Sequence, residues 1–298
     1  MSRSASGLMN WSVALRLGRV SNLPTVWTNV CAGVVLSGAT VTAQLTLLLM
    51  ISLSLFYVGG MFLNDAFDER FDQREQPYRP IPSGQVTSAM VFAYGFGLLA
   101  LGFIILLVIG YVMPGGFGWR APAAGALLAA IIVVYDAWHK TNPIGPAIMA
   151  LCRLLVYVVA GLAAVGALPE RLLLAAIVSL CYLIGLTYVA KQESLRRIGN
   201  VWPLLFLAVP FAYGLPLAIA SLAGLLLYVF LLAAVIGALI FLFRPAVPDV
   251  RHAIMLLIAG ISLLDGLFMA GQGSPLLAAA AVGGFLLTLA FQRFIAGT

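Results

Sequence analysis

Long apolar runs separated by short polar stretches fill almost the whole chain after residue 19. A helix needs about 20 apolar residues to cross a hydrocarbon layer roughly 30 Å thick. Ten windows of suitable length follow one another, at residues 20–38, 44–63, 86–112, 120–138, 143–166, 172–190, 201–220, 222–243, 252–271 and 275–296. Because little chain is left between them, the pattern predicts one all-α, polytopic transmembrane helical bundle over residues 1–298, with no separate water-soluble domain.

Positively charged residues are distributed unevenly between the two sides of this bundle. With the amino terminus inside, the inner segments carry thirteen of the sixteen Lys and Arg residues, and the outer loops carry only Arg120 and Arg171. Lys and Arg accumulate on the cytoplasmic side of membrane helices. We therefore expect an integral protein of the bacterial inner membrane whose amino terminus and inner loops face the cytoplasm. The net charge of +6 follows from this bias, so we expect membrane lipid, and no nucleic acid, among its partners.

Only 9% of the residues are charged, so the stretch NDAFDERFD, residues 64–72, stands out. In a helix that turns by about 100° per residue, four of its polar residues share one face. These residues are Asn64, Asp65, Asp68 and Asp72. Grouped carboxylates repel one another, and Mg²⁺ takes one or two carboxylates and completes its shell with water and substrate phosphates. The stretch therefore predicts a magnesium site, the alternative being a solvated helix end that pairs with Arg70 and Arg74. A zinc site is not expected, because the three cysteines and two histidines lack ligand spacing.

Basic residues recur in three inner loops that come after this stretch in the sequence. They are Arg74 and Arg79 in QREQPYRPIPSG, Lys140 in YDAWHKTNP, and Lys191, Arg196 and Arg197 in YVAKQESLRRIGN. A phosphate-rich group, bridged to the carboxylates by Mg²⁺ and bound by these cations, explains both kinds of charge together. Taken singly, each basic residue is also consistent with the cytoplasmic bias alone.

These motifs resemble those of the UbiA superfamily of intramembrane prenyltransferases. The signature N-D-x-x-D-x-x-x-D of that family is met in full by residues 64–72, and RPIPSG at 79–84 looks like its R-P-L-P-S-G loop. RVSNLPTVWTN at 19–29 resembles the family's first-helix entry, and residues 135–143 lie where the family has its second inner loop. The likeness covers about residues 15–270. The runs YDAWHK and AKQES are also similar to those of the EboC-like bacterial subgroup.

The resemblance implies nine transmembrane helices around a central cavity, with residues 275–296 added as a tenth, C-terminal helix. It also implies that Mg²⁺ on the aspartates binds the diphosphate of a prenyl diphosphate donor, whose allylic cation is captured by an aromatic or other lipophilic acceptor. Metal and basic groups would stabilise the leaving diphosphate, and aromatic faces would stabilise the cation. In this reading Asp68, Asp72 and Lys191 are catalytic. The substrate-binding residues are Arg19, Asn22, Arg74, Arg79, Lys140, Tyr188 and Glu193.

One loop departs from the family. Its second signature has aspartates spaced by four before an Ile-Gly pair, and aligning on Ile198 and Gly199 places Lys191 and Leu195 at those positions. Glu193 is the only carboxylate left in this loop. Two interpretations stay open. In one, a single Mg²⁺ lies on the first signature and Lys191 pairs directly with diphosphate oxygens in place of a second metal. In the other, the acceptor, the donor or the chemistry itself differs from that of the family.

Two ionisable residues, Arg153 and Asp265, lie inside apolar windows. An unpaired charge in hydrocarbon costs several kcal/mol, so we expect them either to pair with each other across helices or to line the cavity and position the acceptor.

Two other classes of function remain open. A small-molecule transporter would also suit ten helices, but no inverted repeat is evident and the charges gather at one membrane face. A non-catalytic prenyl-lipid binding or assembly subunit would explain the altered second signature.

Overall fold

The apolar runs form helices in the computed structural model, which describes residues 9–140, 142–193, 201–244, 248–295 and 297. No strand occurs among these residues. The α-helices are α1 (Trp11–Leu17), α2 (Leu23–Ser37), α3 (Ala43–Phe67), α4 (Glu69–Glu75), α5 (Ser88–Tyr111), α6 (Arg120–Trp138), α7 (Gly145–Val165), α8 (Glu170–Glu193), α9 (Val209–Ile219), α10 (Leu222–Leu242), α11 (Val250–Gly271) and α12 (Pro275–Gln292). Two 3₁₀ segments complete the set, η1 (Val20–Asn22) and η2 (Trp202–Ala208).

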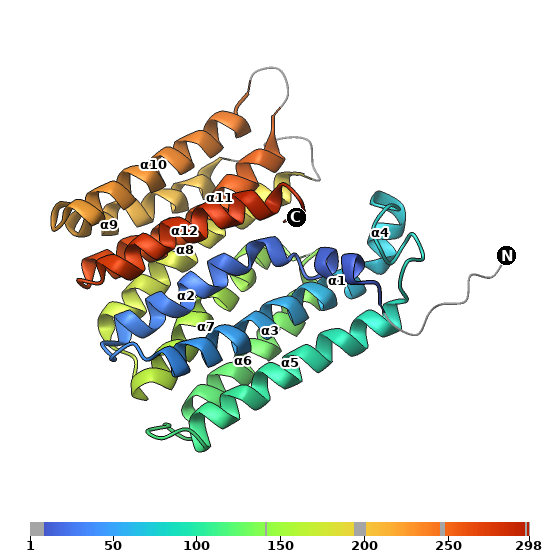
Figure 1. Cartoon of the computed structure of the whole chain (residues 1–298). Helices are drawn as coiled ribbons and strands as arrows, with labels where there is room; N and C mark the ends of the chain where they lie inside the picture. The colour runs from blue at the N-terminus through green and yellow to red at the C-terminus, as the bar shows by residue number, and fades with distance from the viewer. Residues whose placement is uncertain (1–8, 141, 194–200, 245–247, 296, 298) are drawn as a thin grey trace.

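The predicted all-α transmembrane bundle is confirmed, and each of the ten predicted windows contains a helical segment. Within the described residues, nine helical segments are long and apolar enough to cross a membrane, one of them formed by η2 and α9 together. The tenth, α2, is shorter at 15 residues but runs through the middle of the bundle beside α7 (Figure 1). The short helices α1 and α4 lie outside the predicted windows, at the end of the bundle that carries residues 64–72, which we call the aspartate end.

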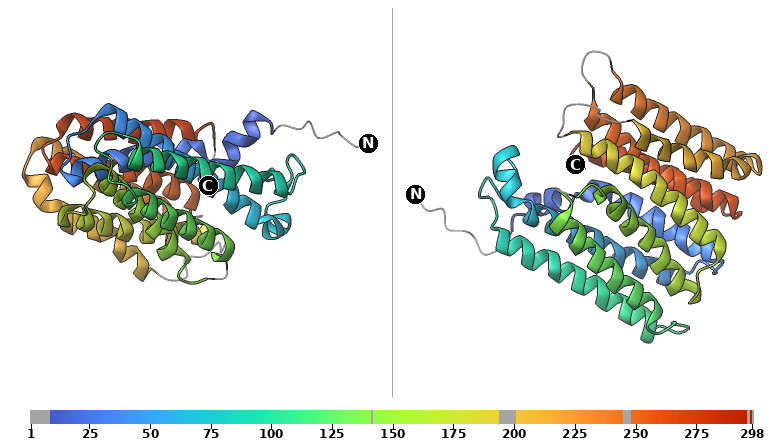
Figure 2. Two further views of the ribbon diagram at one scale, coloured as in Figure 1. Left: turned by 90° about the horizontal axis from the view of Figure 1, so that it is seen from below. Right: turned by 180° about the vertical axis from the view of Figure 1, so that it is seen from behind.

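Two large hydrophobic clusters form most of the described core, and α2 and α7 contribute to both. A third, smaller cluster joins α1, α3 and α5 at the aspartate end. On one side lie α3, α5 and α6, and on the other lie α8 to α12, as the views in Figure 2 show. Helix α11 is the most completely buried span. The close contact of α2 with α7 depends on Gly33, since a Cβ atom there would lie 2.7 Å from Cβ of Ala160.

Helix α12 is the expected additional helix at the C-terminal side of the bundle, and it packs against α11 and α2. The chain after it reaches the aspartate end, where Asn22 Nδ2 donates to the Gly297 carbonyl at 3.0 Å. The Gln292 side chain donates to Asn22 Oδ1, also at 3.0 Å. These bonds place the last described residue beside η1.

Candidate active site

The four signature residues lie on one buried face, as their spacing predicts. Helix α3 ends just before Asp68, yet the backbone bonds from Asp68 N to Asn64 O and from Asp72 N to Asp68 O, 3.0 and 2.9 Å, carry the helical register into α4. All four side chains are buried, Asp68 at 4% and Asp72 at 1% exposure. The alternative of a solvated helix end is therefore wrong, and Arg70 and Arg74 are exposed on α4 instead.

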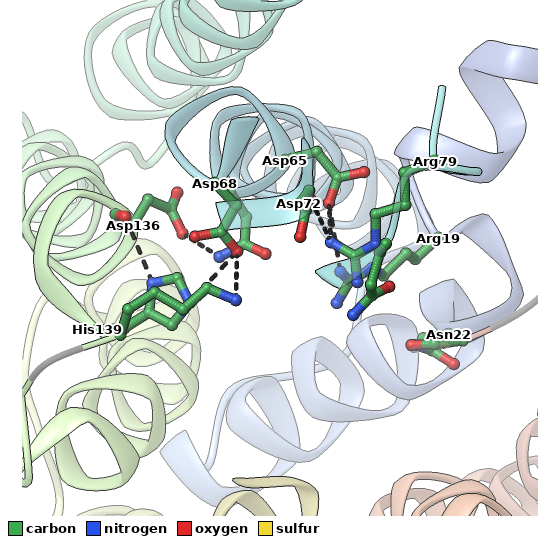
Figure 3. Close-up of polar contacts among 12 residues, drawn as sticks. Arg19, Asn22, Asp65, Asp68, Asp72, Arg79, Asp136 and His139 are labelled. Carbon is green, nitrogen blue, oxygen red and sulfur yellow. Dashed lines mark hydrogen bonds and ion pairs between the residues drawn. The ribbon is translucent and has the colours of Figure 1, made fainter. Parts of the chain in front are cut away.

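Basic residues divide the carboxylates into two groups (Figure 3). In the first group, Arg79 Nη1 lies 2.8 Å from Asp72 Oδ2 and 3.4 Å from Asp65 Oδ1, and Arg19 Nη2 lies 3.4 Å from the same Asp65 oxygen. In the second group, Asp68 Oδ2 lies 2.9 Å from Lys140 Nζ. The first-helix entry, the RPIPSG loop and the loop after α6 thus meet at the signature.

Two residues of this site were not predicted from the sequence, Asp136 and His139. Asp136 is 3% exposed and accepts a 3.1 Å hydrogen bond from the amide of Asn64, while His139 Nε2 lies 3.5 Å from Asp68 Oδ2. The signal was present in the run YDAWHK, since Asp136 lies three residues before His139 and four before Lys140, the spacings at which side chains share a helix face. Without knowledge that α6 packs against α3, that face had no assigned partner.

The two central aspartates differ in electrostatic environment. Burial raises the pKa of the Asp68 carboxyl, but the hydrogen bond from His139 and the charges of His139 and Lys140 outweigh burial and hold that pKa below its ordinary value. Burial also raises the pKa of the Asp72 carboxyl, and Arg79 opposes that rise without cancelling it, so this pKa lies above its ordinary value. Asp72 is therefore the carboxylate that gains more from an additional cation.

The donor set fits a magnesium ion that is only partly coordinated by protein. Asp72 Oδ1 and Asp136 Oδ2 are buried, and neither has a hydrogen-bond partner among the residues that the structure describes. In the described part of the chain, however, no three His, Cys, Asp or Glu side chains converge into a metal cage. Mg²⁺ commonly uses one or two carboxylates and takes its remaining ligands from phosphate and water, so these residues suit an ion that arrives with a phosphate group.

A cavity of about 240 Å³ opens beside this site. Arg19, Tyr135 and Asp136 border it, and most of its wall is apolar, with Leu53, Phe56, Leu128, Ile132, Val156 and Ile258 among the lining residues. Asn22 also borders the cavity, but its amide is engaged by Tyr57, Gly297 and Gln292. A polar, cation-rich end therefore continues into an apolar interior.

The remaining predicted residues belong to α8 and to the segment that follows it. Lys191, near the end of α8, donates from Nζ to the Asn142 carbonyl at 3.2 Å, which links α8 to the loop that follows Lys140. Tyr188 is not among the residues that line the cavity, although its neighbour Thr187 is. The side chain of Glu193 and residues 195–199 fall outside the described part of the chain.

Arg153 and Asp265 do not form the direct ion pair that was one of two expectations. Asn29 lies between them, accepting from Arg153 Nη1 at 3.1 Å and donating to Asp265 Oδ1 at 2.8 Å. The other expectation, that both residues line the cavity, holds for Arg153 but not for Asp265, which is fully buried and is not among the lining residues.

The comparisons agree with this architecture. The model of the UbiA prenyltransferase family matches residues 23–251. A digeranylgeranylglyceryl phosphate synthase of Sulfolobus acidocaldarius is 28% identical over 158 residues, which are 52% of this chain and 54% of that protein. The enzyme of the same name from Methanoregula boonei is 34% identical over 139 residues, 46% of this chain and 47% of that protein. The chain thus spans about half the length of the curated relatives it matches.

Solved structures share the fold at low sequence identity. The apo structure of a UbiA homolog from Aeropyrum pernix K1 covers 89% of this chain and 96% of its own, with a TM-score of 0.63 and 15% identity. A UbiA homolog from Archaeoglobus fulgidus bound to GPP and Mg²⁺ covers 88% of this chain and 99% of its own, with a TM-score of 0.62 and 16% identity. With the matched family model extending over most of the chain and the bundle fold shared, the protein belongs to the UbiA prenyltransferase family.

Proposed function

We propose that the protein transfers a prenyl group from a prenyl diphosphate to an aromatic or other lipophilic acceptor within the membrane, with Mg²⁺ as its cofactor. The observation that carries this proposal is a group of buried, cation-paired aspartates next to an apolar cavity that Arg19 and Asp136 border. Solved UbiA homologs bound to GPP or DMAPP with Mg²⁺ support the choice of donor and metal. The related synthases, by their name, make a lipid that carries a phosphate group.

The diphosphate end of the donor would lie between the two ion-paired groups. Arg79 and Arg19 from one group and Lys140 from the other would exchange part of their contact with aspartate oxygens for contact with phosphate oxygens. Asp72 and Asp68 would hold Mg²⁺, with Asn64 and Asp65 beside them, and the ion would neutralise charge on the departing diphosphate. The Asn64 amide donates to Asp136, which orients this side chain.

The prenyl chain and the acceptor would occupy the apolar part of the cavity. As the allylic C–O bond breaks, the electron pair leaves with diphosphate, and the acceptor forms a new bond to the allylic carbon and loses one proton. The rings of Tyr57 and Tyr135 border the cavity and would stabilise the positive charge of the allylic group. The aliphatic wall would exclude water, which otherwise captures such a cation.

The protein is an integral membrane protein, and we place its aspartate end at the cytoplasmic face of a bacterial inner membrane. The excess of Lys and Arg on that side supports this orientation. We also treat residues 1–298 as a single prenyltransferase domain, with a core over about residues 15–270 and α12 as its addition.

Release of inorganic diphosphate tests the proposal. The full chain in detergent or nanodiscs should release diphosphate from at least one member of a C5 to C20 prenyl diphosphate series only when Mg²⁺ and an acceptor are present. Asp68→Ala should abolish release and weaken Mg²⁺-dependent donor binding, while Asp249→Asn, at an exposed helix end, should retain both. Donor binding without release by the wild-type protein would support a non-catalytic lipid binder, and solute transport without release would support a transporter. Either result would overturn the proposal.

A further inference from the structure

Arg153 is an arginine within a membrane-spanning helix, at a depth where charge is costly. It lies eight residues from the first residue of α7, which corresponds to about 12 Å along the helix from the aspartate end. Its side chain is only partly buried even so, because it borders the cavity. A cation at this depth requires a partner anion or a full set of hydrogen-bond acceptors.

Neutral groups of α2 satisfy only part of the guanidinium. Nη1 donates to the Thr25 carbonyl at 3.2 Å and to Asn29 Oδ1 at 3.1 Å, and Nη2 donates to Thr25 Oγ1 at 3.0 Å. Of the five N–H bonds of an arginine, these contacts use three. Since Thr25 takes the edge between Nη1 and Nη2, the two remaining N–H bonds lie on the edge between Nη2 and Nε, and neither has a partner among the described residues.

The nearest carboxylate does not complete this arrangement. Asp265 is fully buried and accepts from Thr28 Oγ1 at 2.6 Å, from Asn29 Nδ2 at 2.8 Å and from the Tyr157 hydroxyl. It forms no ion pair with Arg153 in the described part of the chain, and its effect passes through Asn29. By accepting the Asn29 amide, Asp265 fixes the Asn29 oxygen toward Arg153, which holds the guanidinium in one orientation.

We propose that the open edge of Arg153 binds an oxyanion, a carboxylate or a phosphate group, on the lipophilic acceptor. Such a planar fork of two N–H groups matches two oxygens of either anion. The donor diphosphate is a poor candidate for this position, because its proposed site is at the end of α3 whereas Arg153 is two turns inside α7. This inference rests on the proposed function for the identity of the bound molecule as the acceptor.

Binding without turnover tests the site separately from the reaction. The full chain in zwitterionic nanodiscs, without Mg²⁺ or donor, is titrated with three radiolabelled probes that share one tail: 4-octylbenzoate, 4-octylphenyl phosphate and 4-octylbenzyl alcohol. Partition into empty nanodiscs is subtracted. The wild-type protein should bind at least one anionic probe about tenfold more tightly than the alcohol, and the tighter of the two anions identifies the class.

Variants assign that preference to Arg153. Arg153→Gln should remove the preference while leaving alcohol binding unchanged, and Arg244→Gln, at an exposed position near the end of α10, should keep it. Arg153→Lys retains the charge without the fork and should lose about tenfold in anion affinity, which provides a second test if Arg153→Gln does not fold. Equal binding of charged and neutral probes by the wild-type protein, or an undiminished preference in both Arg153 variants, would overturn the inference.

Failure of the proposed reaction would look different. If the wild-type protein shows the anion preference but releases no diphosphate with any donor, the anion site stands and the transfer reaction does not. If diphosphate is released but the three probes bind alike, the reaction stands and Arg153 has no part in acceptor recognition.

Discussion

Asp72 Oδ1 is a buried oxygen that has no hydrogen-bond partner among the described residues, although Oδ2 of the same carboxylate is held by Arg79 at 2.8 Å. An unsatisfied acceptor in a buried position costs about 1–3 kcal/mol. The site therefore contains an unfavourable interaction that a metal ion or a donor group would relieve. Asp65 and Asp68 are likewise paired with basic residues, Arg19 and Lys140.

Arg79 should be a major determinant of donor affinity. It contacts two signature aspartates, and a charge-assisted contact to phosphate is worth roughly 1.5–3 kcal/mol. We expect Arg79→Ala to weaken binding of a labelled prenyl diphosphate by about tenfold or more, measured by equilibrium binding with Mg²⁺ present. Arg70→Ala removes an exposed arginine of α4 and should leave that affinity unchanged. An unaltered affinity in Arg79→Ala would mean that its contacts serve only the unliganded protein.

Among individual residues, spacing along the sequence identified residues of one helix better than it identified partners on different helices. Asn64, Asp65, Asp68 and Asp72 follow from helical geometry, because a fixed rotation per residue determines a shared face. Asp136 could not be assigned in that way, since its contact with Asn64 joins residues 72 positions apart. Arg74 lies close in sequence to Asp72 and is exposed on α4 in the structure, so its contact with the diphosphate stays a prediction.

At the scale of the helices, the contact between α2 and α7 supports the cavity wall at Arg153, because α2 holds Arg153 through Thr25 and Asn29. Gly33 permits this close approach, as Ala160 would lie 2.7 Å from an added Cβ. We expect Gly33→Val to destabilise the protein by about 1–3 kcal/mol and to lower its Tm in detergent. Gly97→Val on α5, where nothing lies within 4 Å of an added Cβ, provides the matched control. Equal Tm changes in the two variants would show that helix propensity, not α2–α7 packing, sets the cost.

The end of α8 carries the departure from the family's second signature. If Lys191 supplies the charge of a second metal, Lys191→Asp should reduce turnover more than Lys191→Ala, because aspartate adds a negative charge next to the diphosphate whereas alanine only removes a positive one. Steady-state diphosphate release measures both variants, and the double change Lys191→Asp with Leu195→Asp should restore part of the activity at high Mg²⁺. Two tightly bound Mg²⁺ ions in the wild-type complex, counted by metal analysis, would contradict this replacement.

Helix positions were predicted well because each span must satisfy its own backbone hydrogen bonds in lipid. The ten windows follow from that requirement. The contribution of α2 and α7 to both core clusters could not be predicted, because helices that are apolar on most sides show little periodicity to mark the face that packs. The sequence likewise indicated that Arg153 and Asp265 needed partners. Which partners they found depends on Asn29, a residue with no distinguishing pattern of its own.

For the molecule as a whole, the polar chemistry lies at one end and the volume for substrate lies between the spans. Helices α3 and α6 line the cavity on one side and α8 and α11 on the other, and α2 and α7 contribute the wall between them. Any acceptor must reach a cavity that is lined mostly by aliphatic side chains at membrane depth.

That location makes the bilayer, and not the surrounding water, the medium in which acceptor is dissolved. An apolar acceptor partitions almost entirely into lipid, so cavity occupancy should depend on acceptor molecules per lipid molecule. In mixed micelles, adding acceptor-free lipid at constant total acceptor should lower the rate per enzyme, whereas adding buffer should not. A rate that followed acceptor per litre instead would indicate entry from water. For a cavity placed between spanning helices, the amount of membrane becomes a variable of the rate law, and a cell that expands its membrane would slow this reaction without altering the enzyme.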